Sequence, residues 1–250
     1  MKIALITGAG TGVGKAASLA LLKEGVTVYL SGRRVEKLKE TEELSLNKRY
    51  SGKPIVRSLD VSKESQVEEV FEEIYTNHGR LDLLFNNAGT SSSPKTIDEI
   101  TFEEWKSVVD VNLHGMFLCA KYAFKIMKNQ NPKGGRIINN GSISAMAPRP
   151  GSVPYTTTKH AISGMTKTLS LDGRKYNIAC SQIDIGNAET PMTKKIKLGV
   201  KQPSGEVLAE PVMNAEDVAK SVLYIFNLPL NANVLNMTIM ANSMPFVGRG

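Results

Sequence analysis

The chain has 250 residues, of which 41% are hydrophobic and 22% charged, as in a single globular domain that needs no disulfide or structural metal. The three histidines lack ligand spacing, which predicts no metal. The chain has no run of 18 apolar residues, which predicts no membrane span. The two cysteines lie far apart, which fits a cytoplasmic setting. The net charge of +7 is scattered and not interleaved with aromatic residues, which favours a solvated surface over a nucleic-acid interface.

Short apolar segments alternate with longer amphipathic ones along the whole chain. The short segments, predicted to be strands, cover residues 2–7, 26–31, 54–59, 82–86, 136–141, 178–183 and 234–240. The longer segments, predicted to be helices, cover residues 12–24, 35–46, 64–78, 102–128, 154–175 and 215–228. This alternation predicts one α/β domain with a doubly wound parallel sheet of seven strands and helices on both faces. Ligands bind such sheets in the loops after the strands.

A glycine-rich turn, TGAGTGVG from Thr7 to Gly14, joins the first predicted strand to the first predicted helix. Glycines allow a tight turn and leave free N–H groups at the positive end of the helix, which suits a diphosphate. A P-loop would need glycine at Ala9 and serine or threonine at Ala16. The GxGxxG fingerprint would need glycine at Val13. The turn therefore fits neither of these motifs, and an ATPase is not indicated.

Tyr155 and Lys159 lie four residues apart at the start of a predicted helix that Pro154 can begin. Residues at this spacing share a helix face, so the phenol and the ammonium can point into one cleft. Lowering the tyrosine pKa of about 10 by two to three units requires roughly 3–4 kcal/mol. An ammonium about 4 Å away supplies about 4 kcal/mol at an effective dielectric constant of about 20. Taken alone, the pair is more often a surface contact without chemistry.

Three further features indicate that this pair belongs to a larger set of motifs. Ser142 lies thirteen positions before Tyr155, at the end of the fifth predicted strand, Asn112 lies in the fourth predicted helix, and residues 86–89 read NNAG. Together with the TGxxxGxG turn, these motifs resemble those of the short-chain dehydrogenase/reductase family and extend from Thr7 to Met192. The resemblance implies a single Rossmann-like domain and an NAD(P)-dependent oxidoreductase that interconverts a secondary alcohol and a ketone.

The resemblance also implies the catalytic roles. The residue matching Tyr155 is the general acid/base, and the one matching Lys159 lowers its pKa and holds the nicotinamide ribose. The Ser142 equivalent hydrogen-bonds the reacting oxygen, and the Asn112 equivalent holds a water in a proton relay. A hydride transfer that develops an alkoxide needs such donors and a proton. Asn112 has an alternative as a residue that bends its helix, and Ser144 is a less well spaced alternative to Ser142.

The dinucleotide contacts implied by the resemblance come from the loops after the strands. They are Gly8, Thr11, Gly12, Val13, Arg33, Asp60, Val61, Asn87, Tyr155, Lys159, Gly186 and Thr190. In the loop after the sixth strand, Ile185 stands where the family usually has proline, so this loop departs from the family pattern.

The residues after the second predicted strand favour NADP over NAD as the cofactor. Gly32 leaves room, Arg33 can attract a 2′-phosphate, and the first acidic residue is Glu36, already on the next helix. Thr11 opposes this interpretation, because NADP-specific relatives often have a basic residue there. We therefore expect NADP, held by Arg33 alone or with Arg34, and keep NAD as the alternative.

The sequence does not indicate which small-molecule substrate is bound, because loops 90–96, 146–152 and 192–213 carry no motif. We expect a substrate loop near residues 186–213, in which the lysines are either solvated or contact an anionic substrate: Lys194, Lys195, Lys197 and Lys201. The methionine-rich tail, residues 236–250, is interpreted as closing the active site, as forming an interface or as plain core. The family resemblance implies a homotetramer or homodimer.

Other functions fit the residues less well. A catalytically idle NADP-binding regulatory protein is the main alternative, but it would have no need to keep all four catalytic residue types. An epimerase or dehydratase would normally have glycine at Thr11, and an enoyl reductase would need lysine at Ile162.

Overall fold

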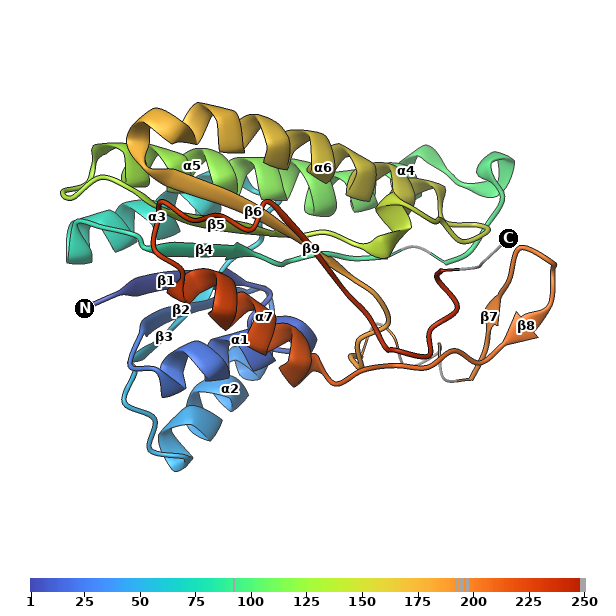
Figure 1. Cartoon of the computed structure of the whole chain (residues 1–250), viewed down its shortest axis with the longest axis horizontal. Coiled ribbons are helices and arrows are strands. Elements are labelled where there is room, and N and C mark those ends of the chain that lie inside the picture. Colours follow the sequence, from blue (N-terminus) through green and yellow to red (C-terminus); the bar gives the residue numbers. More distant parts are fainter. Residues whose placement is uncertain (92, 192, 194–195, 197, 248–250) are drawn as a thin grey trace.

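The computed structural model describes residues 1–91, 93–191, 193, 196 and 198–247. Seven parallel strands form one sheet in the order β3-β2-β1-β4-β5-β6-β9 (Figure 1). Their bounds are β1 Ile3–Thr7, β2 Thr27–Gly32, β3 Pro54–Ser58, β4 Leu83–Asn86, β5 Gly135–Asn140, β6 Ile178–Ile185 and β9 Asn236–Ile239. The strand order reverses between β1 and β4, where doubly wound sheets bind their ligands. The predicted doubly wound, Rossmann-like sheet of seven strands is confirmed.

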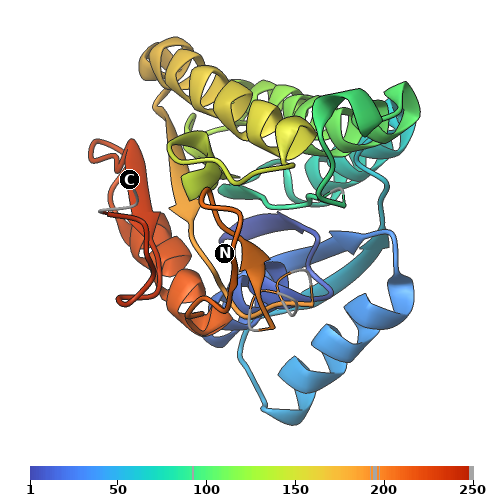
Figure 2. The same ribbon diagram turned by 90° about the vertical axis from the view of Figure 1, so that its right-hand side faces the viewer.

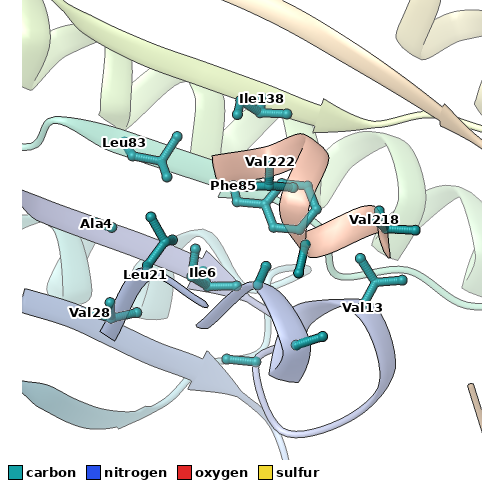
Figure 3. Packing of buried hydrophobic residues seen from close by; sticks show 14 of the residues in the cluster. Ala4, Ile6, Val13, Leu21, Val28, Leu83, Phe85, Ile138, Val218 and Val222 are labelled. Atoms are coloured by element: carbon teal, nitrogen blue, oxygen red, sulfur yellow. The ribbon is translucent and has the colours of Figure 1, made fainter. Parts of the chain in front are cut away.

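Helices cover both faces of the sheet (Figures 1 and 2). One face carries α1 (Gly12–Lys23), α2 (Val35–Asn47) and α7 (Ala215–Asn227), and the other carries α3 (Glu64–His78), α5 (Gly115–Asn129) and α6 (Val153–Gly173). Alternate residues of β1 enter the two cores, because side chains alternate along a strand. Ile6 packs with Phe85 and Val222 in the first core (Figure 3), and Leu5 belongs to the second.

The predicted helix 102–128 is divided into three parts. It consists of α4 (Phe102–Val109), a π-helical segment (Asp110–His114) and α5. A capping box of Thr101 and Glu104 starts α4, as such a pair does at many helix N-termini. The apolar pattern runs through all three parts, so hydrophobic periodicity gives no sign of the π-helical turn. Such turns are frequent at functional sites, and this one carries Asn112.

A two-stranded antiparallel hairpin, β7 (Val200–Lys201) and β8 (Val207–Leu208), lies in the predicted substrate loop. Its strands are only two residues long, too short for their periodicity to show in the sequence. Lys201 lies exposed in β7. The other three lysines of that prediction, Lys194, Lys195 and Lys197, lie outside the described residues. None of the helices described is long and apolar enough to cross a membrane.

Candidate active site

A cavity of about 320 Å³ opens at the carboxyl ends of the central strands. It brings together all twelve residues that the sequence predicts to contact a dinucleotide. These are Gly8, Thr11, Gly12, Val13, Arg33, Asp60, Val61, Asn87, Tyr155, Lys159, Gly186 and Thr190. Of the two other predicted catalytic residues, Ser142 lies next to the lining residue Gly141, and Asn112 next to the lining residue Val111.

The glycine turn is packed so tightly that a side chain has no room. Gly8 has a φ of +70°, and a Cβ atom on Gly14 would lie 2.2 Å from the carbonyl oxygen of Gly8. Because no side chain intervenes, the N-terminus of α1 faces the cavity with its unpaired N–H groups, an arrangement that binds phosphate. Thr190 lies directly across the turn, since its Cγ2 would be 2.9 Å from a Cβ on Gly12. The turn therefore fits the diphosphate of a dinucleotide.

Hydrogen bonds connect this turn to Lys159 through three strand ends. Thr7 Oγ1 accepts from the backbone N–H groups of Asn87 and Ala88, both at 2.9 Å. Asn140 donates through Nδ2 to Asn87 Oδ1 at 2.8 Å, and Lys159 Nζ donates to the carbonyl oxygen of Asn140 at 2.7 Å. The ends of β1, β4 and β5 and the lysine on α6 thus form one connected unit.

Lys159 is a buried ammonium, only 3% exposed. Burial lowers the pKa of Lys159 to about 8, although the charge of Asp184 acts in the opposite direction. Its Nζ lies 5.4 Å from the centroid of the Tyr155 ring. Nζ also donates to the carbonyl oxygen of Asn140, a partner that the sequence could not reveal.

Tyr155 lies on the first turn of α6 and lines the cavity. Burial raises the pKa of Tyr155 above its ordinary value, and the negative charge of Asp184 adds to this. A hydrogen bond with Ser142 and the positive charge of Arg149 lower it. The phenol is therefore protonated at neutral pH in the unliganded protein, as a proton donor must be.

Ser142 precedes the 3-10 helix Ile143–Ala145 and points its hydroxyl at the phenol of Tyr155. The same hydroxyl accepts from the backbone N–H of Ser144 at 3.1 Å. The backbone of Ser144 thereby orients the Ser142 hydroxyl, and the choice between the two serines stays a prediction.

Asn112 is fully buried and its side chain is committed to the chain after β4. Its Oδ1 accepts from the backbone N–H of Thr90 at 2.7 Å, and its Nδ2 donates to the carbonyl oxygen of Thr90 at 2.8 Å. A longer contact of 3.4 Å reaches Thr158, the neighbour of Lys159. The amide thus anchors a wall of the site, and its role in a proton relay stays a prediction.

The far end of the cavity is basic. Arg33 and Arg34 are exposed at its rim, and Lys37 lines it while pairing with Glu40 at 2.6 Å. Lys37 was not among the contacts predicted from the sequence. Its place in the first turn of α2, directly after the basic residues Arg33 and Arg34, was the available signal.

An ion pair joins the predicted substrate loop to the segment before α6. Glu210, whose side chain is 1% exposed, pairs with Arg149 and accepts from Nδ2 of Asn187 at 2.8 Å. Nη2 of Arg149 also donates to Oδ1 of Asn187 at 3.0 Å. The two charged partners are 61 residues apart in sequence, which is why no local pattern indicated them.

The methionine-rich tail packs behind the Ser142 segment. Met244 and Ala241 are buried against Ile143, and the residues packed around them are Met213, Met240 and Phe246. Of the three interpretations, the structure supports a core that forms a wall beside the active site.

The fold and the placement of these residues define an α/β oxidoreductase with a nucleotide cavity. The family model for short chain dehydrogenases matches residues 2–201, and the chain belongs to this family. A 3beta-hydroxysteroid dehydrogenase of Mediterraneibacter gnavus is 34% identical over 84% of this chain and 74% of its own length. An uncharacterised oxidoreductase of Staphylococcus aureus is 32% identical over 95% of this chain and 96% of its own length. The crystal structure of levodione reductase superposes with a TM-score of 0.85 at 26% identity, covering 96% of each chain.

Proposed function

We propose that this protein interconverts a secondary alcohol and a ketone with NADP(H), using Tyr155 as the general acid/base. The observation that carries the proposal is the meeting of Tyr155, Ser142 and Lys159 at the wall of the cavity whose other end holds the glycine turn. The nicotinamide, when bound, supplies or accepts the hydride. The glycine turn, Asp60 and Asn87 would hold the dinucleotide.

The residues of this chain provide the proton and the stabilisation of charge. In ketone reduction, one hydride and one proton are added, and the phenol of Tyr155 donates the proton to the developing alkoxide. The Ser142 hydroxyl hydrogen-bonds the same oxygen. Lys159, charged below its pKa of about 8, stabilises the phenolate that remains. The phenolate then recovers a proton from solvent, and alcohol oxidation is the reverse.

The proposed function predicts turnover with purified protein. A 3-ketosteroid and its 3β-alcohol are the first probes, because the relative from M. gnavus is a 3beta-hydroxysteroid dehydrogenase. A panel of other ketones, aldehydes and sugars follows. We expect a change in NADPH absorbance with at least one of them. Tight NADP(H) binding without turnover across the panel would instead support the idle regulatory protein.

The basic rim predicts a preference for NADP(H) over NAD(H). Charge-assisted hydrogen bonds to a 2′-phosphate contribute roughly 1.5–3 kcal/mol, or about 10- to 150-fold in affinity. Replacing Gly32 with Asp and Arg33 with Ala should invert the preference, measured as kcat/KM with the two cofactors. Lys39→Ala is the matched control, since Lys39 is exposed on α2 and lies away from the cavity lining. A wild-type enzyme that prefers NAD(H) tenfold would show that Arg33 faces solvent.

We propose further that residues 1–250 act as one domain in which residues 186–213 form the substrate loop, and that the protein is a cytoplasmic homo-oligomer. The pairing of Glu210 with Arg149 holds this loop beside Tyr155 and supports its role as the substrate loop.

Exposed apolar side chains support the homo-oligomer: Phe102 of α4 is 71% exposed and Phe117 of α5 is 53% exposed. Both helices lie in the outer layer of the molecule (Figure 1).

A further inference from the structure

A buried carboxylate lies directly beneath the catalytic serine. Asp184 is near the end of β6, a strand in which every residue is buried, and is itself only 3% exposed. It accepts hydrogen bonds from the backbone N–H of Ser142 at 2.9 Å, from Nε2 of Gln182 at 2.7 Å and from Nδ2 of Asn236 at 2.7 Å. All three donors are neutral. Burying a charge in such a place is costly, so a carboxylate here calls for a reason beyond packing.

The backbone that carries Ser142 is shaped around this carboxylate. A Cβ atom on Gly141 would lie 2.1 Å from Oδ1 of Asp184, so no other residue fits there without moving the acid. Gly141 also donates its N–H to the carbonyl oxygen of Ile183 at 2.8 Å. The turn after β5 is thus held to β6 by two consecutive hydrogen bonds, one to the carbonyl of Ile183 and one to the side chain of Asp184.

The same carboxylate is connected to the helix of Tyr155 and Lys159. Nε2 of Gln182 donates both to Asp184 and, at 2.9 Å, to Oγ of Ser163. Oε1 of Gln182 accepts from Oγ1 of Thr166 at 3.2 Å. Ser163 and Thr166 lie one and two turns after Lys159 on α6. A hydrogen-bond network therefore links the acid to both elements that carry catalytic side chains.

We propose that Asp184 is a positioning residue of this active site, whose carboxylate fixes the Ser142 turn to β6 and places a negative charge beside the Tyr155–Lys159 pair. This inference rests on the proposed function. The charged and titratable groups that face one another here are Tyr155 and Lys159 of α6, Arg149 from the preceding loop, and Asp184 of β6. β5 and β9 contribute the neutral amides of Asn140 and Asn236.

The direction in which the pKa values of Tyr155 and Lys159 move distinguishes this role of Asp184 from a structural one. The negative charge of Asp184 raises the pKa of Tyr155 and also that of Lys159. Removing the charge should therefore move both titrations to lower pH. Asp184→Asn is suited to this test: its amide oxygen can still accept from Ser142 and Gln182, and Asn236 can turn its own amide to pair with the new NH₂ group.

The first measurement uses the unliganded protein and needs no substrate. The phenolate absorbance of Tyr155 is titrated as the difference from Tyr155→Phe, in the wild-type and in the Asp184→Asn background. We expect the phenolate to appear at a pH lower by about half a unit or more in Asp184→Asn. An unchanged titration would overturn the proposal, and this holds even if the wild-type protein were to show no turnover and the proposed function failed.

The second measurement is the pH profile of kcat/KM for alcohol oxidation, which reports the pKa values of the free enzyme. Both the rising and the falling side of this profile should move to lower pH in Asp184→Asn. Ser163→Ala is the control. It removes a partner of Gln182 but keeps the charge of Asp184, so its profile should not move. A uniform loss of activity without movement of either side would show a structural role only and overturn the proposal. If Asp184→Asn does not fold, the double variant Gln182→Ala, Asp184→Ala removes the same charge together with its amide neighbour and must show the same shift.

Discussion

Replacing Tyr155 with phenylalanine is expected to lower kcat by about 10²–10⁴-fold, the usual contribution of a positioned general acid. The ring still fills its place at the start of α6, but no proton reaches the alkoxide. NADP(H) affinity should stay within a few-fold of wild type, because the glycine turn and the basic rim are untouched. Steady-state kinetics and a fluorescence titration of NADPH measure the two effects separately.

Tyr75→Phe provides the control for the loss of a phenol. Tyr75 is half exposed on α3 and does not line the cavity, so its variant should turn over like the wild type. Turnover of Tyr155→Phe within tenfold of wild type would refute the assignment of Tyr155 as the acid/base.

Replacing Lys159 with methionine is expected to abolish most activity and, at the same time, to make the protein more stable. Activity falls because the ammonium that stabilises the phenolate is lost. Stability rises because the lowered pKa of about 8, against 10.5 for an ordinary lysine, means that folding buries this charge at a cost of about 3 kcal/mol. The lost hydrogen bond to the Asn140 carbonyl subtracts about 1 kcal/mol. The net gain in unfolding free energy at pH 7 should be about 1–3 kcal/mol.

The pH dependence of this gain follows from linkage. Below the folded-state pKa of about 8, Lys159 is protonated in both the folded and the unfolded chain, and the full cost is present. As the pH rises toward 10.5, the folded protein releases this proton first, so the cost disappears and the two proteins converge. Urea unfolding at pH 7 and at pH 10 measures the difference. Lys167→Met, on the exposed side of the same helix, is the control and should show no such dependence. A Lys159→Met protein that is less stable than wild type at pH 7 would contradict the expectation.

The sequence by itself determined the elements of this protein and their order. The seven strands and the main helices lie within a few residues of the predicted bounds, because apolar periodicity and glycine positions are local properties that each segment carries alone. The same is true of the glycine turn before α1 and of the i, i+4 spacing of Tyr155 and Lys159, so the nature of the site could be predicted before its shape was known.

The tertiary structure decided how those groups face one another. Lys159 lies over the Tyr155 ring and donates to the Asn140 carbonyl, because a buried ammonium takes the hydrogen bonds that its surroundings offer. The π-helical turn at Asn112 arises inside a segment whose apolar pattern is unbroken. The carboxylate of Asp184 reaches Ser142 across 42 residues of sequence. Contacts over such separations depend on which strands become neighbours, and burial then makes an unpaired charge or amide costly, so the partners of these groups are set only when the sheet has formed.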